Sequence, residues 1–288
     1  MPRPITARPG LTASPIAYAG EPGAFAEDAV IAAFGEAAPR LPVGGFREVF
    51  EAVASSAAAT GVVPIENLVN GSVREVYDLL LEHDLQIAAE VVVPVDLCLA
   101  ALPGRTLDDI ERVYSHIQAL GQAERFLRTR PWALMTTYNT AGAGRFIRDQ
   151  GDAVAAAVLS RRAAVAYDLE VLAESIQDVS DNRTRFLVIT VPSPVPDPAS
   201  AAAFRTTIAF GVRNEPGTLL AALQVFGART INLSKLESRP TRASPWEYTF
   251  WADLDAHSEA PECAAALREL AFVATMVRVL GTYAKSGD

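Results

Sequence analysis

Cysteine and histidine are both scarce in this sequence. Its two cysteines, Cys98 and Cys263, lie far apart, and three histidines are scattered along the chain. A disulfide framework needs recurring cysteines, and a metal site needs several cysteine, histidine or carboxylate ligands at close spacing. We therefore expect neither a disulfide-stabilised fold nor a bound metal.

Basic residues are outnumbered by acidic ones, and long apolar runs are lacking. Lysine and arginine total 25 against 34 acidic residues, the formal net charge is −9, and the basic residues form no stripe. This argues against a nucleic-acid or anionic-membrane surface. No apolar run approaches the roughly 18 residues of a membrane span, and the first residues lack the apolar core of a secretory signal. We expect a soluble, cytoplasmic protein.

Apolar residues, by contrast, are abundant enough for a substantial core. They make up 50% of the 288 residues, which excludes a disordered chain and favours two or three domains. One boundary is clear, because residues 192–198 read PSPVPDP, and alternating prolines favour an extended linker. We predict a first domain at 14–191, a linker at 192–203 and a second domain at 204–284.

The first domain alternates short apolar runs with helical patterns. Strands are predicted at 16–20, 61–65, 86–95, 112–116, 133–138, 153–160 and 185–190, and helices at 72–83, 118–129 and 141–150. Such alternation is typical of α/β layers around a mostly parallel sheet. The segment 85–102 breaks this rhythm, and we expect it to cross between two lobes with a cleft at their junction.

The second domain has a different order of elements. The pattern predicts strands at 205–213, 231–239, 247–254 and 276–284 and helices at 216–228 and 261–271. This βαββαβ order is the ferredoxin-like split unit. Alternating side chains make 247–254 a half-buried strand. Asn214 or Glu215 is expected to cap a helix whose first residue is Pro216.

Small or polar residues stand at several strand-to-helix junctions, where ligands bind in open α/β sheets. The junctions lie at 20–23, 64–72, 115–118 and 139–142. Together they would suit a small, doubly anionic ligand, although each alone is more often a simple turn. At 181–186, Thr184 and Arg185 could supply a hydroxyl donor and a carboxylate clamp. From spacing alone, a β-branched residue beside a solvated arginine is the favoured interpretation.

The histidines give little further indication of function. His83 is expected to be exposed at the end of a helix, and His257 to be solvated in an acidic loop. His116 stands at a junction, where it could contact a ligand or be a structural imidazole. The residues alone thus indicate a two-lobed α/β ligand-binding protein with a small βαββαβ domain.

Several motifs in combination resemble the prephenate dehydratase family. They read GEPGAFAE (20–27), VVPIENLVNGSV (62–73), YSHIQALGQAERFL (114–127), NTAGAG (139–144) and DNRTRFLVI (181–189). The motifs NEPGTL (214–219) and ESRP (237–240) resemble the phenylalanine-binding ACT domain fused to such enzymes. The resemblance implies an α/β fold with a two-lobed, periplasmic-binding-protein-like catalytic domain containing a cleft, followed by a ferredoxin-like βαββαβ ACT domain.

The implied reaction removes carbon dioxide and the ring hydroxyl from prephenate to give phenylpyruvate, in L-phenylalanine biosynthesis, without a cofactor. The resemblance makes Thr184 the catalytic residue. Arg185 would pair with a substrate carboxylate or with a neighbouring acid. The expected substrate-binding residues are Asn67, Ser115, Gln118, Asn139, Thr140, Arg185 and Phe186.

The resemblance also implies feedback regulation by L-phenylalanine and a homodimer or homotetramer. A loop of free N–H groups at a helix start suits the carboxylate of an amino acid. The expected effector-binding residues are Asn214, Glu215, Pro216, Gly217, Thr218, Leu219, Glu237, Ser238, Arg239 and Pro240.

Three positions depart from the pattern of the family. Ala26 stands where a hydroxyl residue is usual, Leu68 where a serine follows Asn67, and Ile117 where a proline follows His116. An apolar side chain at a ligand contact can change the ligand that is accepted. A prephenate decarboxylase, an enzyme for a modified prephenate, and a catalytically silent sensor of aromatic metabolites therefore remain alternatives.

Overall fold

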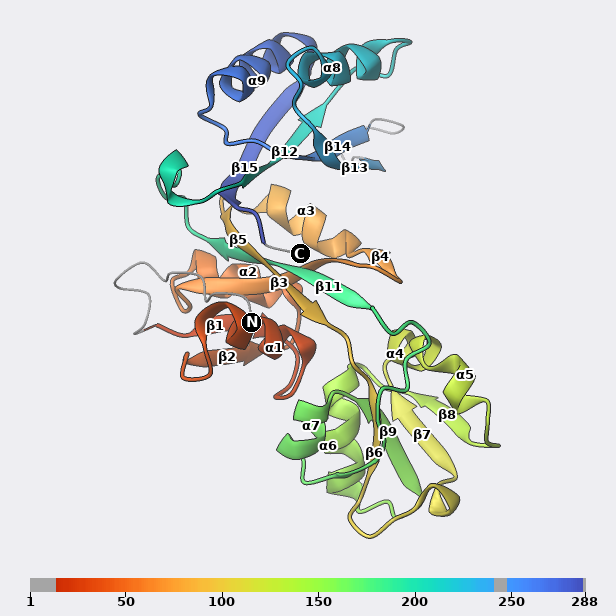
Figure 1. The fold of residues 1–288 in the computed structure, drawn as a ribbon. Coiled ribbons are helices and arrows are strands. Elements are labelled where there is room, and N and C mark those ends of the chain that lie inside the picture. The colour runs from red at the N-terminus through yellow and green to blue at the C-terminus, as the bar shows by residue number, and fades with distance from the viewer. Residues whose placement is uncertain (1–13, 241–247, 287–288) are drawn as a thin grey trace. The chain divides into compact units, whose positions relative to one another are not determined.

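The structure is a computed structural model that describes residues 14–240 and 248–286. The chain forms two compact units (Figure 1). The first unit comprises the residues up to 83 together with 91–188, and the second comprises 84–90 together with the residues from 189 onward.

The first unit contains two lobes, each built on its own sheet. The first lobe is formed by β1 (Ile16–Ala19), α1 (Phe25–Phe34), β2 (Arg40–Val43), α2 (Phe46–Ala54), β3 (Thr60–Asn67), β4 (Gly71–Ser72) and α3 (Arg74–Glu82), with β5 (Gln86–Pro94) and β11 (Arg183–Thr190). Its strand order is β2-β1-β3-β11-β5, and β4 pairs with β3. The strand β1 runs parallel to both of its neighbours, β2 and β3.

The second lobe has a mixed five-stranded sheet. Its elements are β6 (Cys98–Ala101), β7 (Arg112–Ser115), α4 (Ile117–Gln122), α5 (Glu124–Leu127), β8 (Ala133–Thr136), α6 (Thr140–Gln150), β9 (Ala155–Leu159), α7 (Arg161–Ala166) and β10 (Glu170–Ala173). The order is β10-β6-β9-β7-β8. β7 is parallel to β8 and β9, whereas β6 is antiparallel to β9 and β10, so parallel pairing is less general here than the sequence predicts.

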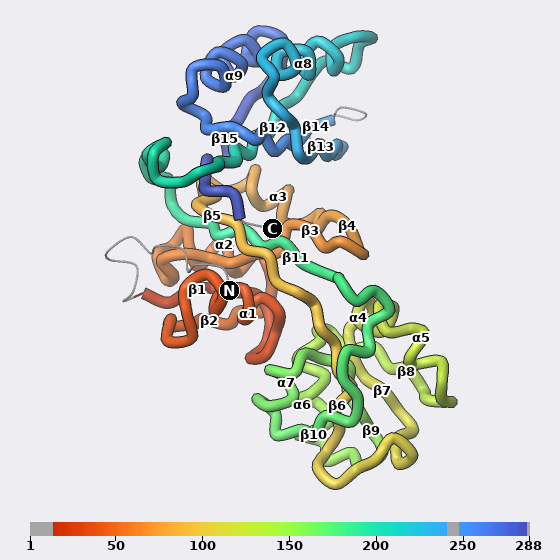
Figure 2. Tube along the Cα trace, viewed as in Figure 1, coloured from red at the N-terminus to blue at the C-terminus, as the bar shows by residue number. Residues whose placement is uncertain are grey.

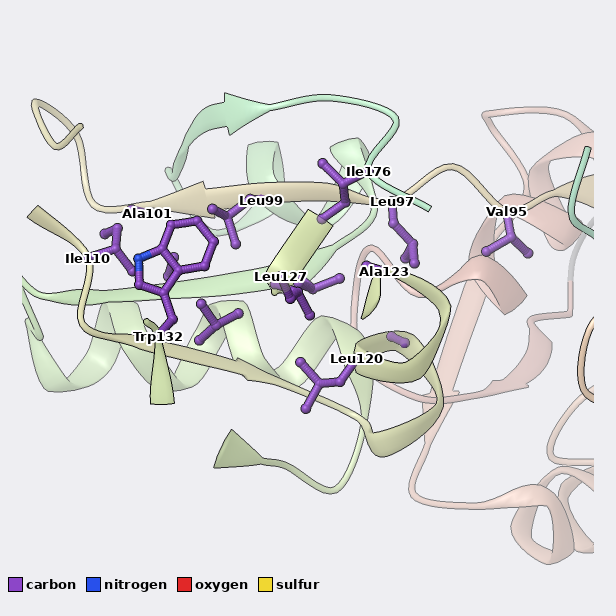
Figure 3. Close-up of a cluster of buried hydrophobic side chains, with 14 residues drawn as sticks. Val95, Leu97, Leu99, Ala101, Ile110, Leu120, Ala123, Leu127, Trp132 and Ile176 are labelled. Carbon is purple, nitrogen blue, oxygen red and sulfur yellow. The ribbon is translucent and has the colours of Figure 1, made fainter. Parts of the chain in front are cut away.

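A hydrophobic core fills the second lobe. Figure 3 shows Leu99, Ile110, Leu127 and Trp132 grouped together, and Trp132 lies 6.0 Å from the ring of Phe126. All four grouped side chains are buried. Burial on this scale stabilises the lobe by about 1.5–3 kcal/mol for each large apolar side chain.

Two segments connect the lobes, one after β5 and one before β11. β5 and β11 are neighbours in the sheet of the first lobe and run side by side in the tube (Figure 2). The Val95 amide donates to the Asn182 carbonyl at 2.8 Å, and the Ile176 amide donates to the Leu97 carbonyl at 2.9 Å. The predicted crossing between lobes is thus confirmed.

The junction at 20–23 joins the lobes at another point. The Gly23 amide donates to the Glu27 carboxylate at 2.6 Å, and the Gly23 carbonyl accepts a hydrogen bond from the Ser160 hydroxyl at 2.6 Å. A Cβ atom on Gly23 would lie 2.3 Å from the Ala163 Cα, and its φ is +87°. The backbone polar groups of Gly23 are therefore engaged by protein atoms.

This close approach predicts that Gly23→Ala destabilises the protein more than a matched change. Gly35 has a similar φ of +89° but no atom within 4 Å of an added Cβ, so Gly35→Ala reports the backbone cost alone. Overpacking against backbone costs about 1–3 kcal/mol. We expect the free energy of unfolding, measured in urea, to fall by about that much more for Gly23→Ala than for Gly35→Ala. Equal losses would contradict the tight contact.

The second unit contains the predicted βαββαβ arrangement. Its elements are β12 (Phe204–Gly211), α8 (Thr218–Gly227), β13 (Leu233–Pro240), β14 (Tyr248–Leu254), α9 (Pro261–Val273) and β15 (Met276–Ala284), with the strand order β13-β14-β12-β15. All three strand pairings are antiparallel, as the split unit requires. The C-terminal fold class is confirmed.

Two local predictions in this unit are wrong. Helix α8 begins at Thr218, and its N-cap is Gly217, which has a φ of +85°, so Pro216 lies outside the helix. The second half of the central strand β14 is buried on both faces, because Trp251 and Asp253 on one face are 2% and 4% exposed and Ala252 and Leu254 on the other are 1% and 0% exposed.

His257 is buried rather than solvated. Its Nε2 bonds to the Pro196 carbonyl at 2.9 Å, and its ring packs edge-on against Phe204.

The segment 84–90 packs tightly within the second unit. A Cβ on Gly281 would lie 2.1 Å from the Ile87 carbonyl oxygen, so only glycine fits there without a shift. The Glu90 carboxylate, on the same segment, pairs with the Arg205 guanidinium and accepts the Ser286 amide at 2.9 Å. Among the residues described, no helix has the length and apolar character needed to cross a membrane.

Candidate active site

Thr184 lies near the start of β11, beside the last residue of β3. Its side chain is largely buried, with the residue 9% exposed. The Asn67 amide Nδ2 donates to the Thr184 hydroxyl oxygen at 3.0 Å, across 117 positions of sequence. Because the amide supplies the hydrogen in this bond, the proton of the Thr184 hydroxyl remains available to another acceptor.

The turn after β3 fixes the orientation of Asn67. Its Oδ1 accepts the backbone amides of Val69 at 3.0 Å and Asn70 at 2.9 Å, an Asx-type turn. Since Oδ1 must face these two N–H groups, Nδ2 must face β11. There Nδ2 also approaches the Asn182 Oδ1 at 2.9 Å and the Arg183 carbonyl at 3.1 Å.

Arg185 pairs with a neighbouring acid. Its Nε lies 2.8 Å from the Glu66 Oε1, and the two side chains are 10% and 33% exposed. Of the two partners that the sequence left open, the acid is present in the structure, and the substrate carboxylate stays a prediction. Phe186, the next residue on β11, is 2% exposed and belongs to the interior.

The predicted residues of the second lobe serve local structure. Ser115 is fully buried and donates its hydroxyl to the Val158 carbonyl at 2.7 Å. Asn139 is the N-cap of α6, where its Oδ1 accepts the Gly142 amide at 2.5 Å, and Thr140 is the first residue of that helix. Gln118 is exposed in the first turn of α4. The structure thus brings Asn67 and Thr184 together, whereas Arg185, the next residue on the strand, pairs with Glu66. The contacts of Ser115 and Asn139 stay within their lobe.

His116 is the N-cap of α4, and its Nδ1 accepts the Gln118 amide at 3.3 Å. Burial lowers the pKa of His116 from its ordinary value, because desolvation disfavours the charged imidazolium. A neutral ring is what this bond requires, since a protonated Nδ1 cannot accept. The structural interpretation of His116 therefore has direct support.

The three departures from the family pattern fall in different environments. Ala26 is 7% exposed inside α1, whereas Leu68 and Ile117 are 68% and 62% exposed. The Leu68 backbone amide donates to the Arg183 carbonyl at 3.0 Å. The main chain of Leu68 therefore connects the turn after β3 to β11. The Leu68 side chain is an apolar group beside Asn67, open to solvent.

Two residues near Thr184 received no separate role from the sequence. Glu66 lies within the PIEN motif and pairs with Arg185, and Asn182 contacts Asn67. Asn182 and Thr184 are two positions apart at the entrance of one strand, so their side chains share a face. That spacing is the signal by which Asn182 could have been found.

The predicted effector segments both belong to the second unit. Residues 214–217 are exposed, and the Thr218 hydroxyl closes their turn by donating to the carbonyls of Arg213 at 2.6 Å and Glu215 at 2.9 Å. Leu219 follows in the first turn of α8. On the edge strand β13, Glu237 and Arg239 are half-buried, whereas Ser238 and Pro240 are exposed. In the described ranges, no three histidine, cysteine or acidic side chains are placed to hold a metal ion.

Comparisons with known proteins point to one family. A family model described as prephenate dehydratase matches residues 16–194, and an ACT domain model matches residues 206–272. The bifunctional chorismate mutase/prephenate dehydratase of Aquifex aeolicus (strain VF5) is 38% identical over 273 residues, which cover 94% of this chain and 74% of that protein. The chloroplastic arogenate dehydratase/prephenate dehydratase 2 of Arabidopsis thaliana is 39% identical, covering 93% of this chain and 72% of that protein.

Solved structures of similar fold cover nearly the whole chain. The prephenate dehydratase of Arthrobacter aurescens in complex with L-Phe is 32% identical with a TM-score of 0.85, covering 94% of this chain and 90% of that one. A protein described as GqqA, a novel type of quorum quenching acylase, is 33% identical with a TM-score of 0.87, covering 94% and 98%.

Proposed function

The chain belongs to the prephenate dehydratase family, and from this membership and the hydroxyl held beside β3 we propose that it converts prephenate to phenylpyruvate. The proposed reaction is a step of L-phenylalanine biosynthesis. The observation that carries the proposal is the hydrogen bond from Asn67 to Thr184, because it holds the threonine hydroxyl with its own proton free for a ligand.

The proposed chemistry needs little more than a well-placed donor. The bond between the ring and its carboxylate breaks, its electron pair enters the ring, and carbon dioxide is released. The electron pair of the carbon–oxygen bond leaves with the ring hydroxyl group. This group takes up a proton from the solvent and departs as water. Aromatisation drives both events. A hydrogen bond from Thr184 that strengthens as the leaving oxygen gains charge lowers the barrier.

Identification of the product tests the proposal. The purified protein is incubated with prephenate, and the products are identified by mass spectrometry and by ultraviolet absorbance. We expect phenylpyruvate together with one equivalent of carbon dioxide. A non-aromatic keto acid would instead indicate the decarboxylase alternative, and no turnover would indicate the sensor. A parallel incubation with arogenate shows whether the amino analogue is also accepted.

Regulation by L-phenylalanine is the second part of the proposal. It is supported by the ACT domain match, and by the relative from Arthrobacter aurescens solved in complex with L-Phe. The exposed turn at 214–217 lies directly ahead of α8, and a helix N-terminus suits a carboxylate. Regulation from this position requires that bound phenylalanine changes the free energy of substrate binding. Such coupling free energies are typically about 1–3 kcal/mol.

We therefore expect saturating L-phenylalanine to lower the apparent affinity for prephenate by about 5- to 150-fold. Asn214→Ala should weaken this response and leave the rate without effector unchanged. Gln224→Ala, an exposed amide on α8, is the matched control and should respond as the unmodified protein does. Initial rates over a matrix of prephenate and phenylalanine concentrations measure both effects. A rate that ignores phenylalanine would refute the regulation.

A homodimer or homotetramer located in the cytoplasm completes the proposal. The oligomeric state rests on the family resemblance, and the location rests on the sequence features described first. Light scattering on the eluting peak of a size-exclusion column measures the mass, for which we expect a multiple of the 30.7 kDa chain.

A further inference from the structure

Asn182 is a buried asparagine at the entrance of β11 that carries an unused donor. The residue is 2% exposed, and its Nδ2 has no hydrogen-bond partner within residues 14–240 and 248–286. A buried N–H group without a partner is unfavourable, so native proteins rarely keep one without a use for it.

The neighbouring contacts fix which end of the Asn182 amide is free. The Oδ1 of Asn67 is held by two backbone N–H groups, those of Val69 and Asn70, so the atom that Asn67 turns toward Asn182 is Nδ2. A donor must meet an acceptor, and the near atom of Asn182 is therefore Oδ1. The Nδ2 of Asn182 is left pointing away from Asn67.

The free donor belongs to the same site as the hydroxyl of Thr184. Asn182 and Thr184 are two positions apart where the strand begins, which places both side chains on one face. Both also contact the single amide of Asn67, at 2.9 and 3.0 Å. One anchored side chain thus holds two neighbouring groups that each retain a hydrogen to donate.

We propose that the Asn182 Nδ2 is a second donor to the substrate, which bonds the leaving oxygen together with the Thr184 hydroxyl. This inference rests on the proposed function, because it takes prephenate as the ligand. Two donors on one developing negative charge, shielded from water, stabilise it far more than they would in solvent. The substrate oxygen satisfies the N–H group that the free protein leaves without a partner.

Two variants test this role. Asn182→Ala removes the amide, and Asn182→Asp keeps its size and the oxygen facing Asn67 but has no N–H group. We expect each to lower kcat by about 10²-fold, with KM changed by less than about threefold, because the bond strengthens only in the transition state. Circular dichroism melting curves show whether each variant folds. If only one of the two folds, its kcat alone tests the role of Asn182. Asn232→Ala, which removes an asparagine bonded to Asp255 in the second unit, is the control and should retain the full rate.

A double-mutant cycle separates direct donation from positioning. If Asn182 contacts substrate, Asn182→Ala still lowers kcat by at least about tenfold in a Thr184→Ala background. If it merely positions Asn67 and Thr184, the second change has no further effect, and the inference is overturned. Full activity of both single variants would overturn it as well. A wild-type protein that forms no phenylpyruvate would instead remove the proposed function.

Discussion

Thr184→Ala is expected to lower kcat for prephenate by about 10²–10³-fold, the loss that follows removal of one donor to a developing oxyanion. The Asn67 amide already donates to the hydroxyl oxygen of Thr184, so the hydroxyl can direct its own proton at the substrate. Alanine removes that proton and leaves the Asn67 amide facing an apolar methyl group. Stopped assays of phenylpyruvate formation at saturating prephenate measure the effect.

Two further variants make this result specific. Thr184→Ser keeps the hydroxyl and should retain at least about a tenth of the activity, since only the packing of one methyl group is lost. Thr190→Ala changes a threonine at the far end of the same strand and should leave kcat unaltered. Wild-type turnover by Thr184→Ala would remove the hydroxyl from the mechanism.

Arg205→Met is expected to lower the free energy of unfolding by about 3–5 kcal/mol, because it removes the guanidinium that pairs with the buried Glu90 carboxylate. The Arg205 and Glu90 side chains are 11% and 2% exposed, and the Ser286 amide also donates to Glu90, at 2.9 Å. Urea denaturation, followed by tryptophan fluorescence, measures the loss.

The matched control is an exposed pair in the same unit. Arg213 and Glu215 approach at 3.3 Å, but their side chains are 70% and 60% exposed, so Arg213→Met should cost no more than about 1 kcal/mol. Adding Glu90→Leu to Arg205→Met should recover most of the stability, since apolar replacement of both partners removes the buried charge. An Arg205→Met protein as stable as the control variant would contradict the burial argument.

The elements of the second unit were predictable because their signals are local. Helix α9 begins at Pro261 and β15 at Met276, as the sequence predicts. The start of α8 was misplaced because Gly217, in a left-handed conformation, provides the cap without a side chain. The double burial of β14 depends on its central place in the sheet, which alternation alone does not reveal.

The first lobe carried weaker signals. The junction at 20–23 indicated a helix but not its bounds, and the N-cap of α1, Ala24, offers no side-chain hydrogen bond. β2 is short, contains a proline and is only partly buried, so it lacks a strand pattern. These elements are stabilised by packing against β1 and β3, a tertiary effect that local propensity does not record.

The site shows the same division between local pattern and tertiary contact. Spacing favoured a solvated arginine beside an ordinary threonine, whereas resemblance singled out Thr184. The pairing of Asn67 with Thr184 joins distant parts of the chain, and no periodicity predicts it. The unused amide of Asn182 depends in turn on how Asn67 is held, so it emerges only from assembled side chains.

The position of residues 84–90 limits how this protein can be divided. A fragment that starts after the proline-rich linker lacks the strand whose carbonyl lies against Gly281 and whose carboxylate neutralises Arg205. Such a fragment would leave Arg205 without Glu90 and would uncover the sheet surface at Gly281. Transplanting this regulatory module between relatives would therefore require two pieces of chain, and a recombination boundary at the linker alone would leave it incomplete.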